Sequence, residues 1–149
     1  AVGADVTDRS SVADLFDRVV AGFGGLDIVV INAGVNLDRQ SVEDSDPEAW
    51  ETTITVNLLG AYYCAQVAIP YLKERGGGKI ITIGSGLGHR GSPGSSAYAC
   101  SKAGLWMLAL QRYMEKHFRS LEIQMPMACS ARWRAFRWER RALSAWVCS

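Results

Sequence analysis

The sequence predicts an α/β fold in which a parallel β-sheet lies between helices, a three-layer αβα arrangement. Two short runs, residues 26–31 and 79–83, are almost continuously apolar and rich in β-branched residues. Such runs are typical of strands that are covered on both faces of a parallel sheet. Helical patterns precede, separate and follow them, and short loops with several glycines join the elements. The order helix, strand, helix, strand, helix therefore favours a single parallel sheet.

The first helix is predicted to start at about residue 10. Its apolar residues recur at the helical spacing i, i+3, i+4, i+7 and i+8. They are Val12, Leu15, Phe16, Val19 and Val20. We expect Ser10 or Ser11 to cap the start of this helix, and Gly22 and Gly24 to end it.

A second, longer helix is predicted from Asp46 to about Glu74. Asp46 suits the N-cap and Pro47 suits the first helical position, and three glycines at 76–78 stop the helix. A third helix is expected to begin near Ser95 or Ala97, after a loop of Gly, Ser and Pro, and to run to about residue 117. Residues 122–124 could begin a further strand.

Length and composition indicate one ordinary globular domain. The chain has 149 residues, of which 48% are hydrophobic and 21% charged. The formal net charge of +1 argues against a nucleic acid or an anionic membrane as partner. No apolar run is long enough to cross a bilayer.

The cysteines indicate neither a metal site nor a disulfide framework. Cys64, Cys100, Cys129 and Cys148 do not form a C-x-x-C pair, and neither histidine lies near them at metal-ligand spacing. We therefore expect no metal. Scattered thiols are compatible with a reducing compartment, so a cytoplasmic location is expected.

Tyr98 and Lys102 are the centre of the functional argument. Four residues apart on a predicted helix, they share one face. A nearby ammonium favours the phenolate form of a tyrosine, which can then take up or release a proton in catalysis. This spacing alone is weak evidence, because surface helices often carry a Tyr and a Lys in this way.

Two further predicted strand ends carry polar or small residues. Ser85 follows the second strand, 13 residues before Tyr98, and Asn32-Ala33-Gly34 follows the first. Ligands of open α/β sheets bind at the carboxyl ends of strands, where a serine hydroxyl can bond a carbonyl and small residues let a flat ligand approach. Each segment could also be an ordinary turn, which would be the better interpretation without the Tyr and Lys.

Asn57 is an unusual residue for the middle of a helix. Its apolar neighbours Val56, Leu58 and Leu59 indicate burial, so its amide needs hydrogen-bond partners. A mid-helix Asn commonly marks a solvent-facing side or a local bend. A helix kink or a role in a proton relay is the sharper interpretation.

Taken together, these segments resemble the short-chain dehydrogenase/reductase family, over about residues 1–117. The family signature N-N-A-G resembles Ile31-Asn32-Ala33-Gly34, with Ile in place of the first Asn, and residues 24–27 are similar to its usual lead-in. The family's catalytic residues fall on Asn57, Ser85, Tyr98 and Lys102. Its Asp-Val pair, which meets the adenine ring, is similar to Asp5-Val6.

The resemblance implies a partial doubly wound, Rossmann-like sheet and an enzyme that uses NAD or NADP to interconvert a secondary alcohol and a ketone. A 3-oxoacyl, sugar-like or steroid-like substrate would fit. In this mechanism Ser85 polarises the substrate oxygen and Tyr98 transfers the proton. Lys102 favours the tyrosinate and binds the nicotinamide ribose, while Asn57 holds a water that links Lys102 to solvent. The parent enzyme is expected to be a homo-oligomer.

The resemblance leaves both ends of the family pattern unmatched. No Gly-rich T-G-x-x-x-G-x-G turn occurs, and no Pro-Gly follows residues 122–124. From residue 120 the composition changes: the last 30 residues hold three of the five Trp and five Arg, but no Lys, Asp or Gly. We therefore divide the chain into a partial catalytic domain (1–119) and an atypical segment (120–149). A shifted reading frame or aberrant splicing would explain the segment from residue 125 onward.

Two alternatives to this interpretation remain. Residues 132–147 could be a functional basic and aromatic tail that binds a membrane surface, a protein groove or nucleic acid. The chain could also be a catalytically silent fragment that acts only as an oligomerisation module.

The absent first strand of the family pattern has a physical consequence. It would leave the strand at residues 26–31 with an unpaired hydrophobic edge, and such edges promote aggregation. Without a Gly-rich turn to hold the pyrophosphate, the chain as given is also expected to be inactive.

Overall fold

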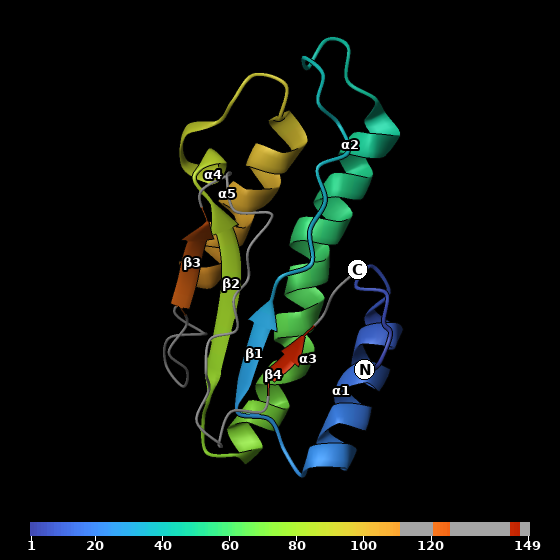
Figure 1. Cartoon of the computed structure of the whole chain (residues 1–149), viewed down its shortest axis with the longest axis vertical. Coiled ribbons are helices and arrows are strands. Elements are labelled where there is room, and N and C mark those ends of the chain that lie inside the picture. Colours follow the sequence, from blue (N-terminus) through green and yellow to red (C-terminus); the bar gives the residue numbers. More distant parts are fainter. Residues whose placement is uncertain (111–120, 126–143, 147–149) are drawn as a thin grey trace.

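The computed structural model contains a parallel sheet of four strands in the order β3-β2-β1-β4 (Figure 1). It describes residues 1–110, 121–125 and 144–146. The strands are β1 (Ile28–Ile31), β2 (Lys79–Ser85), β3 (Leu121–Met125) and β4 (Ser144–Trp146). The parallel α/β class predicted from the sequence is confirmed.

The described residues also form six helical segments. They are α1 (Arg9–Phe23), α2 (Pro47–Ile54), the π-helix η1 (Thr55–Leu59), α3 (Gly60–Glu74), α4 (Leu87–Arg90) and α5 (Ser96–Leu110). α3 packs against β1 and α5 packs against β2, while α1 lies on the outer side of α3 (Figure 1). Ile80, Ile81 and Thr82 are consecutive in β2 and all buried, so both faces of this strand are covered, as its unbroken apolar sequence predicts.

The start of α1 differs from the prediction that Ser10 or Ser11 caps it. Asp8 is the N-cap, and its carboxylate accepts a hydrogen bond of 2.9 Å from the backbone N–H of Ser10. Ser11 instead accepts a bond from the backbone N–H of Asp5. A carboxylate at the N-cap satisfies a helix donor and also complements the helix dipole. At the other end, Gly24 adopts a left-handed conformation (φ 77°) and closes the helix, as predicted, whereas Gly22 lies inside the helix and does not end it.

The long helix predicted from Asp46 is present but is divided by a π-helical turn. Asp46 caps α2 and Pro47 occupies its first turn, as expected. The π-helix η1 separates α2 from α3 and has Asn57 at its centre. Single π turns inside α-helices often occur at functional sites. The helix is therefore irregular at Asn57, where a kink or a proton-relay role was expected.

Strand limits differ slightly from the sequence prediction. β1 begins at Ile28 rather than at Leu26, although Leu26 is buried, and β2 continues two residues beyond Ile83 to Ser85. β3 confirms the further strand expected at 122–124. The third helix is described from Ser96 to Leu110, and its expected continuation to residue 117 lies outside the described residues.

The expectation that β1 has an open edge is wrong. β4 pairs with β1 in parallel along three residues, which align Ile28 with Ser144, Val29 with Ala145 and Val30 with Trp146. The atypical C-terminal segment therefore supplies the backbone groups that this edge would otherwise leave unpaired.

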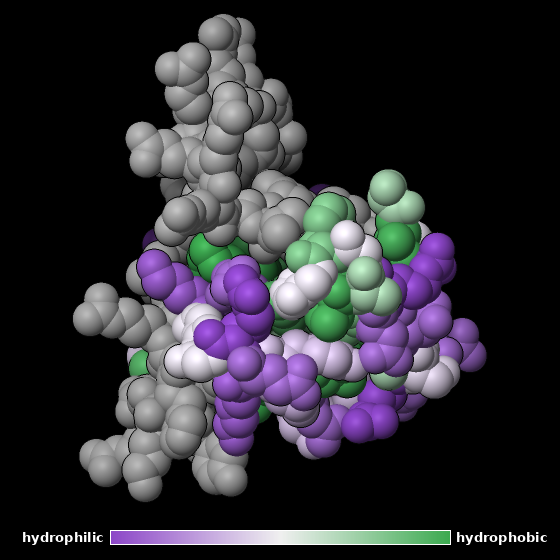
Figure 2. All heavy atoms as spheres, turned by 90° about the horizontal axis from the view of Figure 1, so that it is seen from below, coloured by the Kyte–Doolittle hydropathy of each residue, from purple (hydrophilic) through white to green (hydrophobic). Residues whose placement is uncertain are grey.

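The end of the molecule at which β1 and β2 begin is largely polar. Seen from below, hydrophilic residues line its margin and hydrophobic residues show between them (Figure 2). Arg75 and Asp27 form an ion pair of 3.3 Å at this end. The backbone N–H of Lys79 also donates to the carbonyl of Asp27, which fixes the start of β2 beside that of β1. None of the described helices is long and apolar enough to cross a membrane.

Removal of residues 144–149 tests the pairing of β4 with β1. The shortened chain should form larger assemblies than the complete chain at equal concentration, because the apolar edge of β1 is then exposed. Size-exclusion chromatography with light scattering measures this. A chain that lacks only residues 147–149 keeps β4 and is the matched control. Equal particle sizes for all three chains would contradict the role given to β4.

The thiol of Cys64 should be much less reactive than that of Cys100. Cys64 is buried in the core on α3, and burial raises the pKa of its thiol to about 11. Only the thiolate reacts, and roughly one Cys64 thiol in a thousand is ionised at pH 8. Cys100 is exposed.

A colorimetric thiol reagent can measure this difference in a chain whose Cys129 and Cys148 are replaced by Ser. One thiol should react at once and the other slowly, at a rate that increases with pH up to about 11. Cys100→Ser identifies the fast phase. Two fast phases at pH 8 would show that Cys64 is accessible.

Candidate functional site

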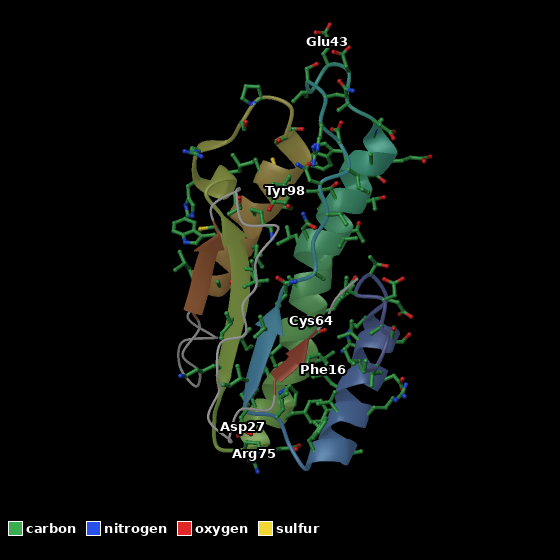
Figure 3. All side chains as sticks on the ribbon, in the orientation of Figure 1. Phe16, Asp27, Glu43, Cys64, Arg75 and Tyr98 are labelled. Carbon is green, nitrogen blue, oxygen red and sulfur yellow. The ribbon has the colours of Figure 1, made fainter. Side chains whose placement is uncertain are left out.

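Apart from Asp5 and Val6, the candidate residues lie at one end of the sheet, near the carboxyl ends of β1 and β2. Asn32, Ala33 and Gly34 follow β1 directly, and Ser85 is the last residue of β2. Tyr98 is on the first turn of α5 and lies near the end of β2 (Figure 3). Asp27 and Arg75 mark the opposite end of the molecule (Figure 3).

Lys102 joins α5 to β2 through its side chain. It is 5% exposed, and its Nζ donates a hydrogen bond of 2.8 Å to the carbonyl of Ile83, two residues before Ser85. The same Nζ lies 5.7 Å from the centre of the Tyr98 ring. The ammonium is therefore held close to both the tyrosine and the strand that carries the serine, as the four-residue spacing predicts.

Ser85 is held at the point where β2 turns into α4. Its side chain is buried, and its Oγ accepts a hydrogen bond of 3.3 Å from the backbone N–H of Leu87. Because that N–H is the donor, the hydroxyl keeps its own proton for an oxygen acceptor. α4 also packs closely on α5: a Cβ at Gly88 would lie only 2.7 Å from the backbone carbon of Lys102. Glycine at this position therefore lets the two elements approach.

Asn57 binds the loop after β1 with its side chain. It is completely buried, and its Oδ1 accepts a bond of 2.7 Å from the backbone N–H of Val35. Its Nδ2 donates to the carbonyl of Val35 at 2.8 Å and to Ser101 Oγ at 3.0 Å. The expectation that this buried amide needs partners is confirmed, and three hydrogen bonds satisfy it.

Gly34 leaves the backbone open next to two of these polar groups. A Cβ there would lie 3.2 Å from Asn57 Oδ1 and 3.6 Å from Lys102 Nζ. Gly34 itself is exposed, whereas Asn32 and Ala33 are partly buried. A flat ligand can thus reach the backbone beside the ammonium of Lys102.

Asp5 and Val6 are placed apart from this cluster. Val6 is buried in the core, where it meets Gly60 at the start of α3. Asp5 is exposed, and hydrogen bonds from the side chain and backbone of Thr7 hold the pKa of its carboxyl below its ordinary value. The hydrogen bonds of Asp5 join it to Thr7 and Asp8 in its own loop and to Ser11 of α1.

Sequence reasoning missed two groups of this site. One is the hydroxyl of Ser101, which is completely buried between Asn57 and the carbonyl of Tyr98. The other is the backbone carbonyl of Ile83. For Ser101, the available signal was a serine next to Lys102 in an otherwise apolar helix. The carbonyl of Ile83 could not be identified from the sequence, because every residue has one. Among the described residues, no group of three His, Cys, Asp or Glu side chains could hold a metal ion.

Comparison with known proteins defines the class of this chain. The family model described as short chain dehydrogenase matches residues 1–131, and the chain belongs to this family.

Curated relatives and solved structures agree with this assignment. The chain is 39% identical over 104 residues to the cis-4-hydroxycyclohexanecarboxylate dehydrogenase of Sinomonas cyclohexanicum, a match that covers 70% of this chain and 42% of the relative. It is 42% identical over 102 residues to the D-beta-hydroxybutyrate dehydrogenase of Rhizobium meliloti, covering 68% and 39%. A 3-ketoacyl-ACP reductase structure from Sinorhizobium meliloti 1021 has a TM-score of 0.77 at 36% identity, covering 81% of this chain and 49% of that one. The chain therefore spans half or less of the length of these relatives.

Asn57→Leu tests how much the buried amide contributes to the stability of the fold. The apolar side chain would fit in size but would leave the N–H and carbonyl of Val35 without their partner. We expect a loss of about 2–4 kcal/mol in the free energy of unfolding, measured with urea. Gln66→Leu removes an exposed amide from α3 and should change the same free energy by less than about 0.5 kcal/mol. A comparable effect of both substitutions would contradict the role of Asn57.

Proposed function

We propose that the protein that carries this chain is an oxidoreductase that transfers hydride between NAD or NADP and a small molecule, interconverting a secondary alcohol and a ketone. The observation that supports this most is the position of Lys102. Its ammonium lies next to the Tyr98 ring, to the backbone of the strand that ends at Ser85, and to the open backbone at Gly34. Membership in the short chain dehydrogenase family adds to this argument.

The residues around Gly34 suit a nicotinamide cofactor. Asn32, Ala33 and Gly34 present small or polar groups at a strand end, where nucleotides bind in open α/β sheets. Lys102, whose Nζ lies beside Gly34, would donate to a ribose hydroxyl, and Asp5 and Val6 would meet the adenine. When bound, the cofactor supplies or accepts the hydride. One similar structure, at 25% identity and a TM-score of 0.79, is an NAD+-bound xylitol dehydrogenase.

Side chains of this chain would transfer the proton to and from the substrate oxygen. Ser85 would donate a hydrogen bond to the substrate oxygen, and Tyr98 would give that oxygen a proton during reduction or take it during oxidation. The ammonium of Lys102, 5.7 Å from the centre of the Tyr98 ring, would place a positive charge beside the phenol that gives up or receives this proton. Since Asn57 Nδ2 uses both protons, on Val35 and Ser101, Asn57 would hold the relay water only by accepting a hydrogen bond from it.

The substrate class rests on the chemistry of the relatives. Their names specify hydroxy acids, as in D-beta-hydroxybutyrate dehydrogenase, or 3-oxoacyl groups, as in the 3-oxoacyl-[acyl-carrier-protein] reductase of Thermotoga maritima, which is 37% identical over 101 residues. A 3-oxoacyl or 3-hydroxyacyl compound is therefore the first substrate to test, before sugars and steroids.

A second candidate function is that of a silent oligomerisation module. Large hydrophobic side chains are exposed on η1, α3 and α5, which pack against one another through η1. They are Leu59, Tyr62, Met107 and Leu110. Exposed apolar side chains of this size are typical of contacts between copies of a chain. Calorimetric titration with NADH and NADPH of the chain joined at both ends to the corresponding segments of a relative separates the two functions, because a silent module binds neither cofactor even then.

Replacement of Tyr98 by Phe should abolish turnover but preserve cofactor binding. The change removes one hydroxyl and no packing, so kcat should fall roughly 100- to 10,000-fold while the Kd for the cofactor stays nearly the same. The measurement uses the chain joined at both ends to the corresponding segments of a curated relative. Tyr62→Phe, on the exposed side of α3, is the control. Activity of Tyr98→Phe within a few-fold of the parent would rule out the proposed proton donor.

Replacement of Lys102 by Met should weaken cofactor binding and slow the chemical step together, because one ammonium serves both. Loss of a charged hydrogen bond predicts an increase in cofactor Kd of roughly 10- to 100-fold, with a fall in kcat at saturating cofactor. Lys79→Met removes an exposed ammonium from the far end of β2 and should affect neither. A Lys102→Met enzyme with normal cofactor affinity would contradict the double role.

A further inference from the structure

The hydroxyl of Ser101 is the link between Asn57 and the helix that carries Tyr98 and Lys102. It lies on α5, next to Lys102, and is completely buried. Its Oγ donates a hydrogen bond of 2.8 Å to the carbonyl of Tyr98 and accepts one of 3.0 Å from Asn57 Nδ2. Asn57 in turn binds the backbone of Val35, one residue after Gly34.

The directions of these hydrogen bonds fix the orientation of the Asn57 amide. A serine hydroxyl has one proton, and here it goes to the carbonyl of Tyr98. The oxygen can therefore only accept from Asn57, so Nδ2 must face Ser101. This leaves Oδ1 toward the N–H of Val35 and toward Gly34. The opposite orientation of the amide would place two acceptors, Oδ1 and Ser101 Oγ, against each other.

We propose that Ser101 is a positioning residue for the reaction, which sets the loop at 34–35 against Tyr98 and Lys102. The proposal rests on the proposed function, because it adds Ser101 to the residues that serve the same reaction. Without the hydroxyl, the amide loses its only hydrogen bond to α5 among those described. Asn57 still holds Val35, but hydrogen bonds no longer connect this loop to the helix that carries Lys102. Small displacements of reacting groups have large effects on rate, on the order of 100-fold for about 1 Å.

The kinetic test compares Ser101→Ala with Ser96→Ala in the chain joined to the segments of a relative. Ser96 also lies on α5 and also accepts a hydrogen bond from another helix, from Trp50 Nε1, but it does not contact Asn57. Both substitutions should lower the melting temperature. Only Ser101→Ala should lower kcat, by roughly 100-fold, and change the shape of the pH–rate profile. Ser101→Thr retains the hydroxyl and should recover most of kcat.

Two results would overturn the proposal in this test. One is a kcat for Ser101→Ala no lower than that of Ser96→Ala at an equal loss of melting temperature. The other is an unchanged pH–rate profile. If Ser101→Ala does not fold, Ser101→Cys serves instead, because the thiol fills the site and is only a weak hydrogen-bond partner. Its kcat should then lie between those of Ser101→Ala and the parent, and a parental kcat would contradict the proposal.

Hydrogen exchange separates failure of this proposal from failure of the proposed function. The N–H of Val35 donates to Asn57 Oδ1, so its exchange in the unmodified chain should be slow and should accelerate in Ser101→Ala but not in Ser96→Ala. This measurement needs no turnover. Unchanged exchange at Val35 would refute the link through Ser101, even in an active enzyme. Faster exchange at Val35, together with no cofactor binding by the chain joined to the segments of a relative, would refute the proposed function but keep the link.

Discussion

The parallel pairing of β1 with β2 is the constraint on which the rest of the structure depends. Their register aligns Val30 with Ile81 and Ile31 with Thr82, so the residues after β1 lie beside the last residues of β2. The carbonyl that receives the Lys102 ammonium and the hydroxyl of Ser85 are both on this part of β2. A slip of the register by one residue would turn every side chain of the strand to the other face and would separate these groups.

The buried amide of Asn57 then connects this sheet edge to the helices. An unpaired amide in such a position would cost about 1–3 kcal/mol, and the chain avoids that cost by bonding it to Val35 and Ser101. The π-helical turn is where the long helix departs from α geometry to place this side chain. One residue thus explains both the irregularity of the helix and its attachment to the loop beside Gly34.

Elements with strong local sequence patterns could be predicted from the sequence. Contacts that form only when helices and strands pack together could not. The Asp46-Pro47 helix start, the two apolar strands and the shared face of Tyr98 and Lys102 follow from short-range patterns. The bond from Asn57 to Ser101 spans 44 residues and that from Lys102 to Ile83 spans 19, so they exist only once α5 has packed. The pairing of β4 with β1 was missed for the same reason. The N-cap at Asp8 was missed because two serines nearby offered the same chemistry.

Most polar contacts of the candidate site end on backbone groups. Lys102 binds the carbonyl of Ile83, Ser85 accepts from the N–H of Leu87, and Asn57 uses both the N–H and the carbonyl of Val35. Backbone partners are present whatever side chain a position carries. The geometry of such a site therefore depends on the fold and on a few polar residues. It can be retained while most of the surrounding side chains differ. That is the pattern expected of a chain that is 42% identical to one relative over 102 residues and 34% identical to another over 139 residues, and that has the fold of a similar solved structure.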